Sequence, residues 1–91
     1  MQTSPQTPAV ADAAPGAPVL TPYDEQHLIT YLRLLDAAEA GAEWKEVSRV
    51  MLGIDPETAP DRARRAWETH LARARWMVES GYRHLLRPAG S

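Results

Sequence analysis

The side chains best suited to chemistry in this 91-residue chain are three histidines and a group of arginines. His27, His70 and His84 lie on three different predicted helices, so a metal site would require all three to converge in space. The chain has no cysteine, no glycine-rich phosphate loop and no serine beside a plausible base. The sequence therefore predicts a protein that is not an enzyme, with no catalytic residue, no metal, no cofactor and no small-molecule ligand.

Arginines open the last long predicted helix. Arg62, Arg64 and Arg65 follow a short predicted helix and a turn over residues 53–56, which is the order of a helix-turn-helix unit. In such a unit the second helix enters the major groove of DNA. The same helix also contains opposite charges four residues apart, which would support a solvated face: Asp61–Arg65, Arg64–Glu68 and Arg75–Glu79. These residues by themselves favour DNA binding and protein binding about equally.

Trp76 shifts the interpretation towards a protein partner. It follows Trp67 by nine residues, about half a helical turn out of phase, and is predicted to lie on the outer face beside Arg65 and Arg73. An exposed tryptophan among arginines is typical of a protein interface, although residues 82–86 could instead fold back over it. The predicted partner-binding set is Trp76, Arg65, Arg73, Tyr82 and Arg83, and the alternative DNA-binding set is Arg62, Arg64 and Arg65.

Three helices must position these side chains. Thr21-Pro22-Tyr23-Asp24 predicts a helix start, and this first helix ends at Gly41. A second helix is predicted over residues 42–52, with Gly53 as its end, and a third over residues 60–79, before a short helical turn at 82–86. The expected buried residues of the first helix are Leu28, Tyr31, Leu32, Leu35 and Ala38. Those of the third are Ala63, Trp67, Leu71, Ala74 and Val78.

The length allows one domain, and its ends differ in composition from its middle. Five prolines fall within the first 22 residues, so residues 1–20 are predicted to be a disordered tail. Residues 21–87 form the predicted helical domain, and 88–91 a disordered C-terminus. The predicted fold is all-α, a small bundle of three to four helices that contains the helix-turn-helix-like unit.

Charge is sorted along the chain. The net charge is -2, but residues 23–57 carry eight acidic and three basic side chains, whereas residues 58–91 carry seven arginines and three acidic side chains. The basic half could steer the chain towards an acidic protein surface. No apolar run reaches the length of a membrane span, and the N-terminus lacks the features of a signal peptide. With no cysteine present, the expected location is the cytoplasm.

Several motifs resemble a proteobacterial family of helix-turn-helix-like domains of unknown function. They are Leu28-x-x-x-Leu32-x-x-Leu35-Asp36, Ala40-Gly41-Ala42-x-Trp44-x-Glu46-Val47, Leu52-Gly53, and Arg73-x-Arg75-x-Met77-x-x-x-Gly81-Tyr82-Arg83-x-Leu85-Leu86. A chain this short is most similar to the QseM-type antiactivators of rhizobial integrative and conjugative element transfer. That resemblance implies quorum-sensing control of horizontal gene transfer by binding TraR-like and FseA-like activator proteins. Acidic residues beside the arginines depart from the DNA-binding members, so the sequence favours an antiactivator with DNA as an unlikely partner.

Overall fold

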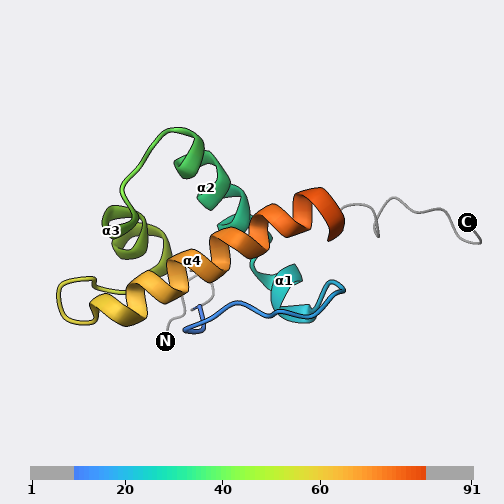
Figure 1. Ribbon diagram of the computed structural model, residues 1–91, viewed down its shortest axis with the longest axis horizontal. Coiled ribbons are helices and arrows are strands. Elements are labelled where there is room, and N and C mark those ends of the chain that lie inside the picture. The colour runs from blue at the N-terminus through green and yellow to red at the C-terminus, as the bar shows by residue number, and fades with distance from the viewer. Residues whose placement is uncertain (1–9, 82–91) are drawn as a thin grey trace, which may run out of the picture.

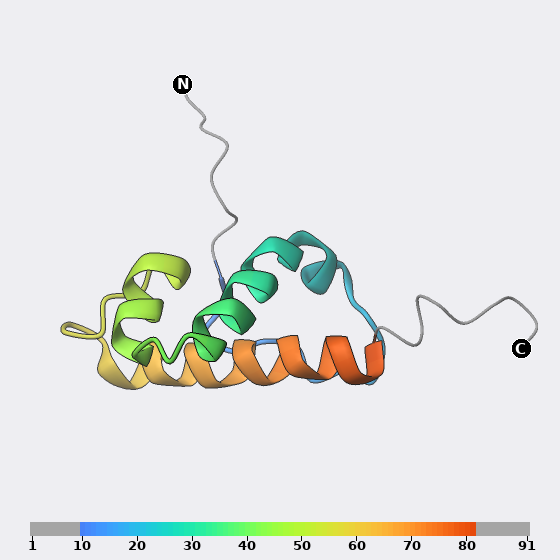
Figure 2. The same cartoon turned by 90° about the horizontal axis from the view of Figure 1, so that it is seen from above.

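A computed structural model of the chain describes residues 10–81, and this part is helical without any strand. Its helices are α1 (Pro22–Gln26), α2 (Leu28–Glu39), α3 (Trp44–Val47) and α4 (Pro60–Trp76). Two π-helical turns extend the last two helices: η1 (Ser48–Leu52) follows α3, and η2 (Met77–Gly81) follows α4. The predicted all-α class is confirmed. Figures 1 and 2 show α4 as the longest element, with α2 and α3 packed together on one side of it.

The first helix begins where the sequence predicted. Thr21 caps α1: the Asp24 backbone N–H donates to Thr21 Oγ1 at 3.2 Å, and the Thr21 N–H donates to Asp24 Oδ2 at 2.8 Å. The predicted single helix is, however, divided at His27, whose backbone leaves the helical region at φ -113° and ψ 22°. The His27 ring stacks on Tyr23 with centroids 4.0 Å apart, and its Nδ1 lies 2.8 Å from the Tyr23 carbonyl oxygen. The division lets α1 turn its carboxylate, Asp24, into the interior.

The buried face of α2 differs from the prediction. Tyr31, Leu34 and Ala37 are buried, whereas Leu28 and Leu32 are exposed. Tyr31 sets this rotation, because its hydroxyl donates to the buried Asp24 Oδ1 at 2.7 Å. The predicted set of buried residues in the first helix was therefore wrong at two of its five positions. It omitted Leu34 and Ala37, which are buried.

Tight turns separate α2, α3 and α4. Gly41 and Gly53 both have positive φ, at 76° and 70°, and Gly53 ends the second helix as predicted. Between η1 and α4, Ile54 and Pro56 are buried, so this turn is anchored in the core. α4 then begins at Pro60, the predicted position.

Small side chains let α4 lie close to its neighbours. Ala63, Ala66 and Ala74 are fully buried in the core, together with Leu71. The predicted core face of this helix is therefore largely confirmed, but Val78 is exposed at the end of the helix. The predicted helical turn over residues 82–86 lies outside the described residues.

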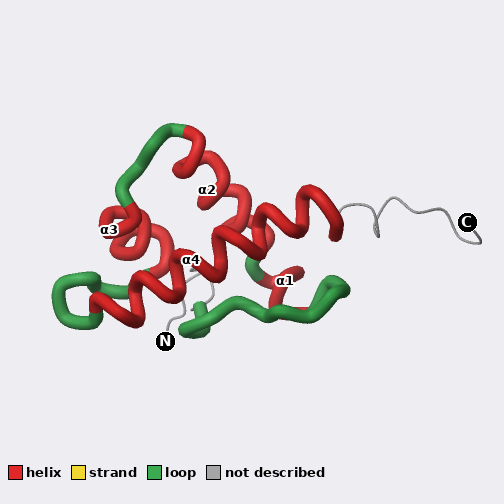
Figure 3. The backbone as a smooth tube through the Cα atoms, viewed as in Figure 1, coloured by secondary structure: helices red, strands yellow, loops and turns green. Residues whose placement is uncertain are grey.

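Residues 10–20 have no regular secondary structure and pack along α4. Figure 3 shows this irregular segment on the side of α4 opposite α2. The Ala14 N–H donates to Thr69 Oγ1 at 3.0 Å, and Arg73 donates to the carbonyls of Ala17 and Val19 at 2.6 and 2.8 Å. These bonds fix the path of a segment in which two prolines and a glycine disfavour a helix.

Candidate nucleic-acid interface

Arg64 is held in a defined position at the start of α4. Its guanidinium carbon lies 5.1 Å from the ring centroid of Trp44 and 5.5 Å from that of Trp67, and Nε donates to Glu68 Oε2 at 2.9 Å. The two tryptophan rings are 6.4 Å apart. Contact with two aromatic rings restricts the rotamers of a long side chain while its charge stays accessible to solvent. The sequence placed Trp67 among the buried residues of its helix and did not connect it with Trp44 or Arg64, because nothing local joins positions 44 and 67.

Arg65 is the adjacent exposed arginine. Among the described residues its guanidinium forms no ion pair, so the predicted pair with Asp61 is absent. The predicted pair between Arg75 and Glu79 is likewise absent in the described part of the chain, whereas Arg64–Glu68 is present. The expectation that carboxylates neutralise the arginines of this helix therefore holds for one of three pairs.

Arg62 points towards the N-terminal segment, where its Nε lies 2.6 Å from Asp12 Oδ1. Both side chains are more than half exposed, so this pair contributes little to stability. Arg62 and Arg65 thus lie on neighbouring faces of the first two turns of α4, whereas Arg64 lies on the side that carries Trp44 and Trp67. The N-terminus of a long helix adds a partial positive charge at the same place.

The predicted partner-binding set is not assembled as expected. Arg73, predicted on the outer face, is buried: Nε donates to Asp24 Oδ1 at 3.0 Å and Nη2 to Asp24 Oδ2 at 2.7 Å. Trp76 is half-buried, and its ring centroid lies 3.9 Å from the Arg73 guanidinium carbon. It lines a groove with residues 14–18 of the N-terminal segment. Tyr82 and Arg83 lie outside the described residues.

The ion pair of Arg73 with Asp24 is a structural element. Burial raises the pKa of Asp24, but hydrogen bonds from Arg73, Tyr31 and Thr21 outweigh it and hold that pKa well below its usual range. The same bonds raise the pKa of Arg73. The pair therefore stays charged and joins α1, α4 and the N-terminal segment.

The two histidines among the described residues, His27 and His70, have structural contacts. The His70 Nδ1–H donates to the Ala66 carbonyl at 2.7 Å, which leaves Nε2 to accept from the Tyr23 hydroxyl at 2.5 Å. Burial lowers the pKa of His70, so the ring is neutral. His27 is buried against Tyr23, and His84 lies outside the described residues. Within residues 10–81 no group of three acidic or histidine side chains is placed to hold a metal ion.

An all-helical domain whose longest helix begins with three arginines has the general features of helical nucleic-acid-binding domains. A family model described as "T6SS, Transcription factor, DNA binding domain" matches residues 4–87. The chain belongs to this family, the RovC DNA-binding domains. No match was found among curated proteins.

The family corrects the main functional prediction. Membership of a family of transcription-factor DNA-binding domains contradicts the QseM-type assignment and the antiactivator function that followed from it. It also contradicts TraR-like and FseA-like activators as the partners and DNA as an unlikely one, and supports the alternative. The antiactivator prediction rested on an exposed Trp76 and on acidic residues beside several of the arginines, and in the structure Trp76 is half-buried beside the N-terminal segment. The family is not one of enzymes, in agreement with the sequence. No helix among the described residues is long and apolar enough to cross a membrane.

Proposed function

We propose that this chain is the DNA-binding part of a transcription regulator and contacts duplex DNA through the first two turns of α4. The observation that carries the proposal is the pair of neighbouring arginines there, Arg65 exposed without an ion pair and Arg64 held by two tryptophans. The expected compartment remains the cytoplasm, which the cysteine-free sequence favours.

The two arginines suit different roles on DNA. A guanidinium held in one orientation can donate two parallel hydrogen bonds to O6 and N7 of a guanine, and Arg64 has that restraint. Arg65 is exposed and unrestrained among the described residues, which suits contact with a phosphate. We therefore assign base contact to Arg64 and backbone contact to Arg65.

The existing ion pairs do not prevent this use. Arg62–Asp12 and Arg64–Glu68 are both about half exposed, and such pairs contribute at most about 1 kcal/mol. Phosphates at the high charge density of DNA can replace these carboxylates, because each new contact also releases a counterion.

A fluorescence anisotropy titration of a labelled mixed-sequence duplex tests the proposal. Wild-type binding should weaken as the salt concentration rises. Arg65→Ala should make the negative slope of log affinity against log salt shallower by about 0.9. That change corresponds to about eightfold weaker binding near 0.1 M salt. Arg33→Ala is the matched control, since Arg33 is an exposed arginine on α2 with no ion pair among the described residues.

Two results would overturn the proposal. The first is the absence of binding by the wild-type chain at micromolar concentration and low salt. The second is an equal loss of affinity in Arg33→Ala and Arg65→Ala, which would indicate a response to net charge and not to a surface on α4.

A further inference from the structure

The N-terminal segment, residues 10–20, follows one side of α4 over several turns of that helix (Figure 3). Three contacts pair successive residues of the segment with successive residues of the helix. They are Asp12 with Arg62, Ala14 with Thr69 and Ala17 with Arg73. The three helix positions are seven and four residues apart, so they share one side of α4. The segment therefore runs parallel to α4 and covers that side from its first turn onwards.

The covered side borders the arginine to which the proposed function assigns a phosphate contact. Arg65 is three residues after Arg62 and four before Thr69, so the three side chains form one row along the helix. Arg62 is itself in contact with the segment through Asp12. The segment thus lies beside the part of α4 that is proposed to approach DNA.

The width of the major groove decides whether the segment can stay there. This groove is about 12 Å wide, and an α-helix with its side chains is about 10–12 Å across. One helix therefore fills the groove and leaves no room for a second chain along its side. Because of this limit, α4 can enter the groove only when the N-terminal segment has left the side that contains Arg62 and Thr69.

The contacts of the segment are weak enough for DNA to displace them. The Asp12 carboxylate is 2.6 Å from Arg62 Nε, but both side chains are more than half exposed. The Ala14 N–H donates to Thr69 Oγ1 at 3.0 Å. Residues 11–18 have small side chains apart from Asp12 and the prolines, and none of these residues is buried. Little apolar surface therefore holds the segment on α4.

We propose that the N-terminal segment is an autoinhibitory element that occupies the side of α4 needed by duplex DNA and competes with DNA for it. The Asp12 carboxylate takes the place of a phosphate on Arg62. The apparent affinity for DNA is then the affinity of the open chain, in which the segment has left α4, reduced by the fraction of chains that are open. This inference rests on the proposed function, because it concerns the same surface of α4.

A reversible tether tests the competition. The chain has no cysteine, so Ala14→Cys with Thr69→Cys introduces a single pair, at positions where the Ala14 nitrogen and Thr69 Oγ1 are 3.0 Å apart. The oxidised form, with the segment held on α4, should bind the labelled duplex about tenfold more weakly than the same protein after reduction. Both forms have the same net charge and the same arginines, so only the position of the segment differs.

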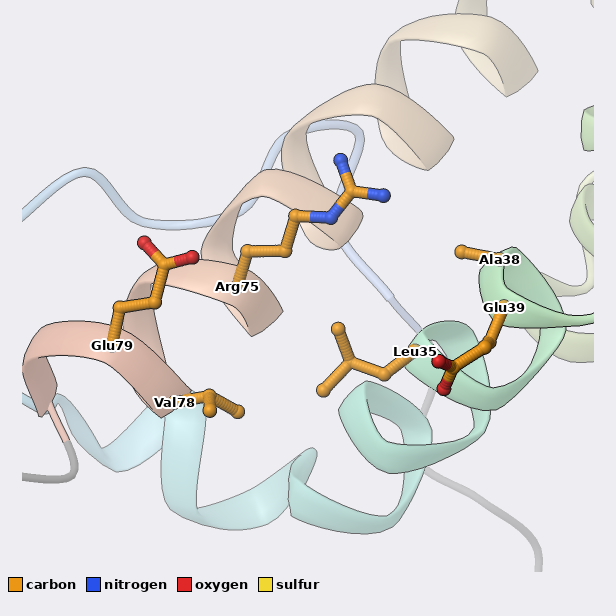
Figure 4. A pocket seen from close by; sticks show the side chains of 6 residues that line it. All are labelled: Leu35, Ala38, Glu39, Arg75, Val78 and Glu79. Atoms are coloured by element: carbon orange, nitrogen blue, oxygen red, sulfur yellow. The ribbon is translucent and has the colours of Figure 1, made fainter.

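Leu35→Cys with Val78→Cys is the matched control tether. Figure 4 shows these two side chains pointing towards each other across a groove between α2 and η2. No residue of the N-terminal segment lines this groove, so a disulfide there restrains the fold without holding the segment. The oxidised and reduced forms of this control should bind DNA equally.

Release of the segment provides a second measurement. Ala14→Pro removes the N–H that bonds Thr69 and leaves the net charge unchanged, so it should raise DNA affinity about two- to tenfold. Gly16→Ala is its control in the same segment, because a methyl group there meets no other part of the chain within 4 Å. This control should bind DNA like the wild type.

The outcomes separate the autoinhibition from the proposed function. Equal binding by the oxidised and reduced Ala14→Cys, Thr69→Cys protein would overturn the autoinhibition and leave the proposed function intact. An unchanged affinity in Ala14→Pro would do the same. An absence of DNA binding in every form, with the reduced and Ala14→Pro proteins included, would overturn the proposed function and the autoinhibition with it.

Discussion

Replacing Arg73 with methionine should destabilise the fold strongly, although the sequence predicted an exposed side chain at this position. The guanidinium is only 6% exposed. It makes two hydrogen bonds to Asp24 and two to the carbonyls of Ala17 and Val19. Methionine is unbranched and apolar and replaces the aliphatic part of the arginine side chain, so the change removes the charge and the donors while keeping most of the packing.

The size of the destabilisation follows from the hydrogen bonds that Asp24 keeps after the substitution. Asp24 is fully buried and would keep only its bonds from Tyr31 and Thr21. Removing one partner of a buried ion pair costs about 3–5 kcal/mol, because the other charge is left without compensation. At about 0.05–0.15 kcal/mol per residue, a domain of this size has a free energy of unfolding of about 4–11 kcal/mol. Arg73→Met should therefore remove about a quarter or more of the stability.

Urea unfolding followed by far-ultraviolet circular dichroism measures this loss. Arg75→Met is the control, since this neighbouring arginine on α4 is exposed and has no ion pair among the described residues. Its cost should stay below about 0.5 kcal/mol. Adding Asp24→Asn to Arg73→Met should restore part of the stability, because the uncompensated charge is then gone.

The reasoning would be refuted if Arg73→Met unfolded within about 1 kcal/mol of the wild type. That result would mean that the guanidinium is accessible to water, as the sequence had suggested, and that the N-terminal segment does not depend on it.

Two further predictions concern His70 and Asp12. Burial lowers the pKa of His70 below the value of about 6.5 in the unfolded chain, so the unfolded state binds more protons and the melting temperature should fall as pH drops below that value. A melting temperature that stays constant between neutrality and about pH 5 would contradict this prediction. Asp24 does not interfere in that range, because its lowered pKa means that its contribution to stability is lost only below about pH 4. Asp12→Ala should raise DNA affinity up to about fivefold by releasing Arg62 from its 2.6 Å ion pair. The matched control is Asp36→Ala on α2. An equal gain in DNA affinity in both variants would show that only the net charge of the chain matters.

Local signals predicted the helices well. The cap at Thr21, the glycine end at Gly53 and the proline start at Pro60 each act within a few residues, and the structure has a helix boundary at all three. Such boundaries are predictable because backbone hydrogen bonding and φ preference depend on adjacent residues.

The faces of the helices were less predictable. Leu28, Leu32 and Leu35 have helical spacing, but α2 turns its other side, with Leu34 and Ala37, towards α4. The spacing of apolar residues identifies an apolar side of a helix, but it does not show which part of that side packs on the neighbouring helix. That choice depended on Tyr31, whose hydroxyl bonds Asp24 in a different helix.

Ion pairing was also poorly predictable from sequence spacing. Sequence spacing paired three arginines of α4 with carboxylates four residues away, but in the described residues only Arg64 has that partner. Arg73 instead pairs with Asp24, which lies 49 positions earlier in the chain. Pairing between exposed charges is weak enough that rotamer freedom and long-range contacts decide it.

The sequence by itself determined an all-helical chain with arginines at the start of its last long helix, because capping, helix ends and composition are local properties. Only the tertiary structure decided which of those arginines are free and which support the fold. Arg73 and Arg65 are the same residue type on the same helix, yet one is buried against a carboxylate and the other faces solvent. Their difference arises from the segments that pack on α4, and no property of the two positions along the chain predicts it.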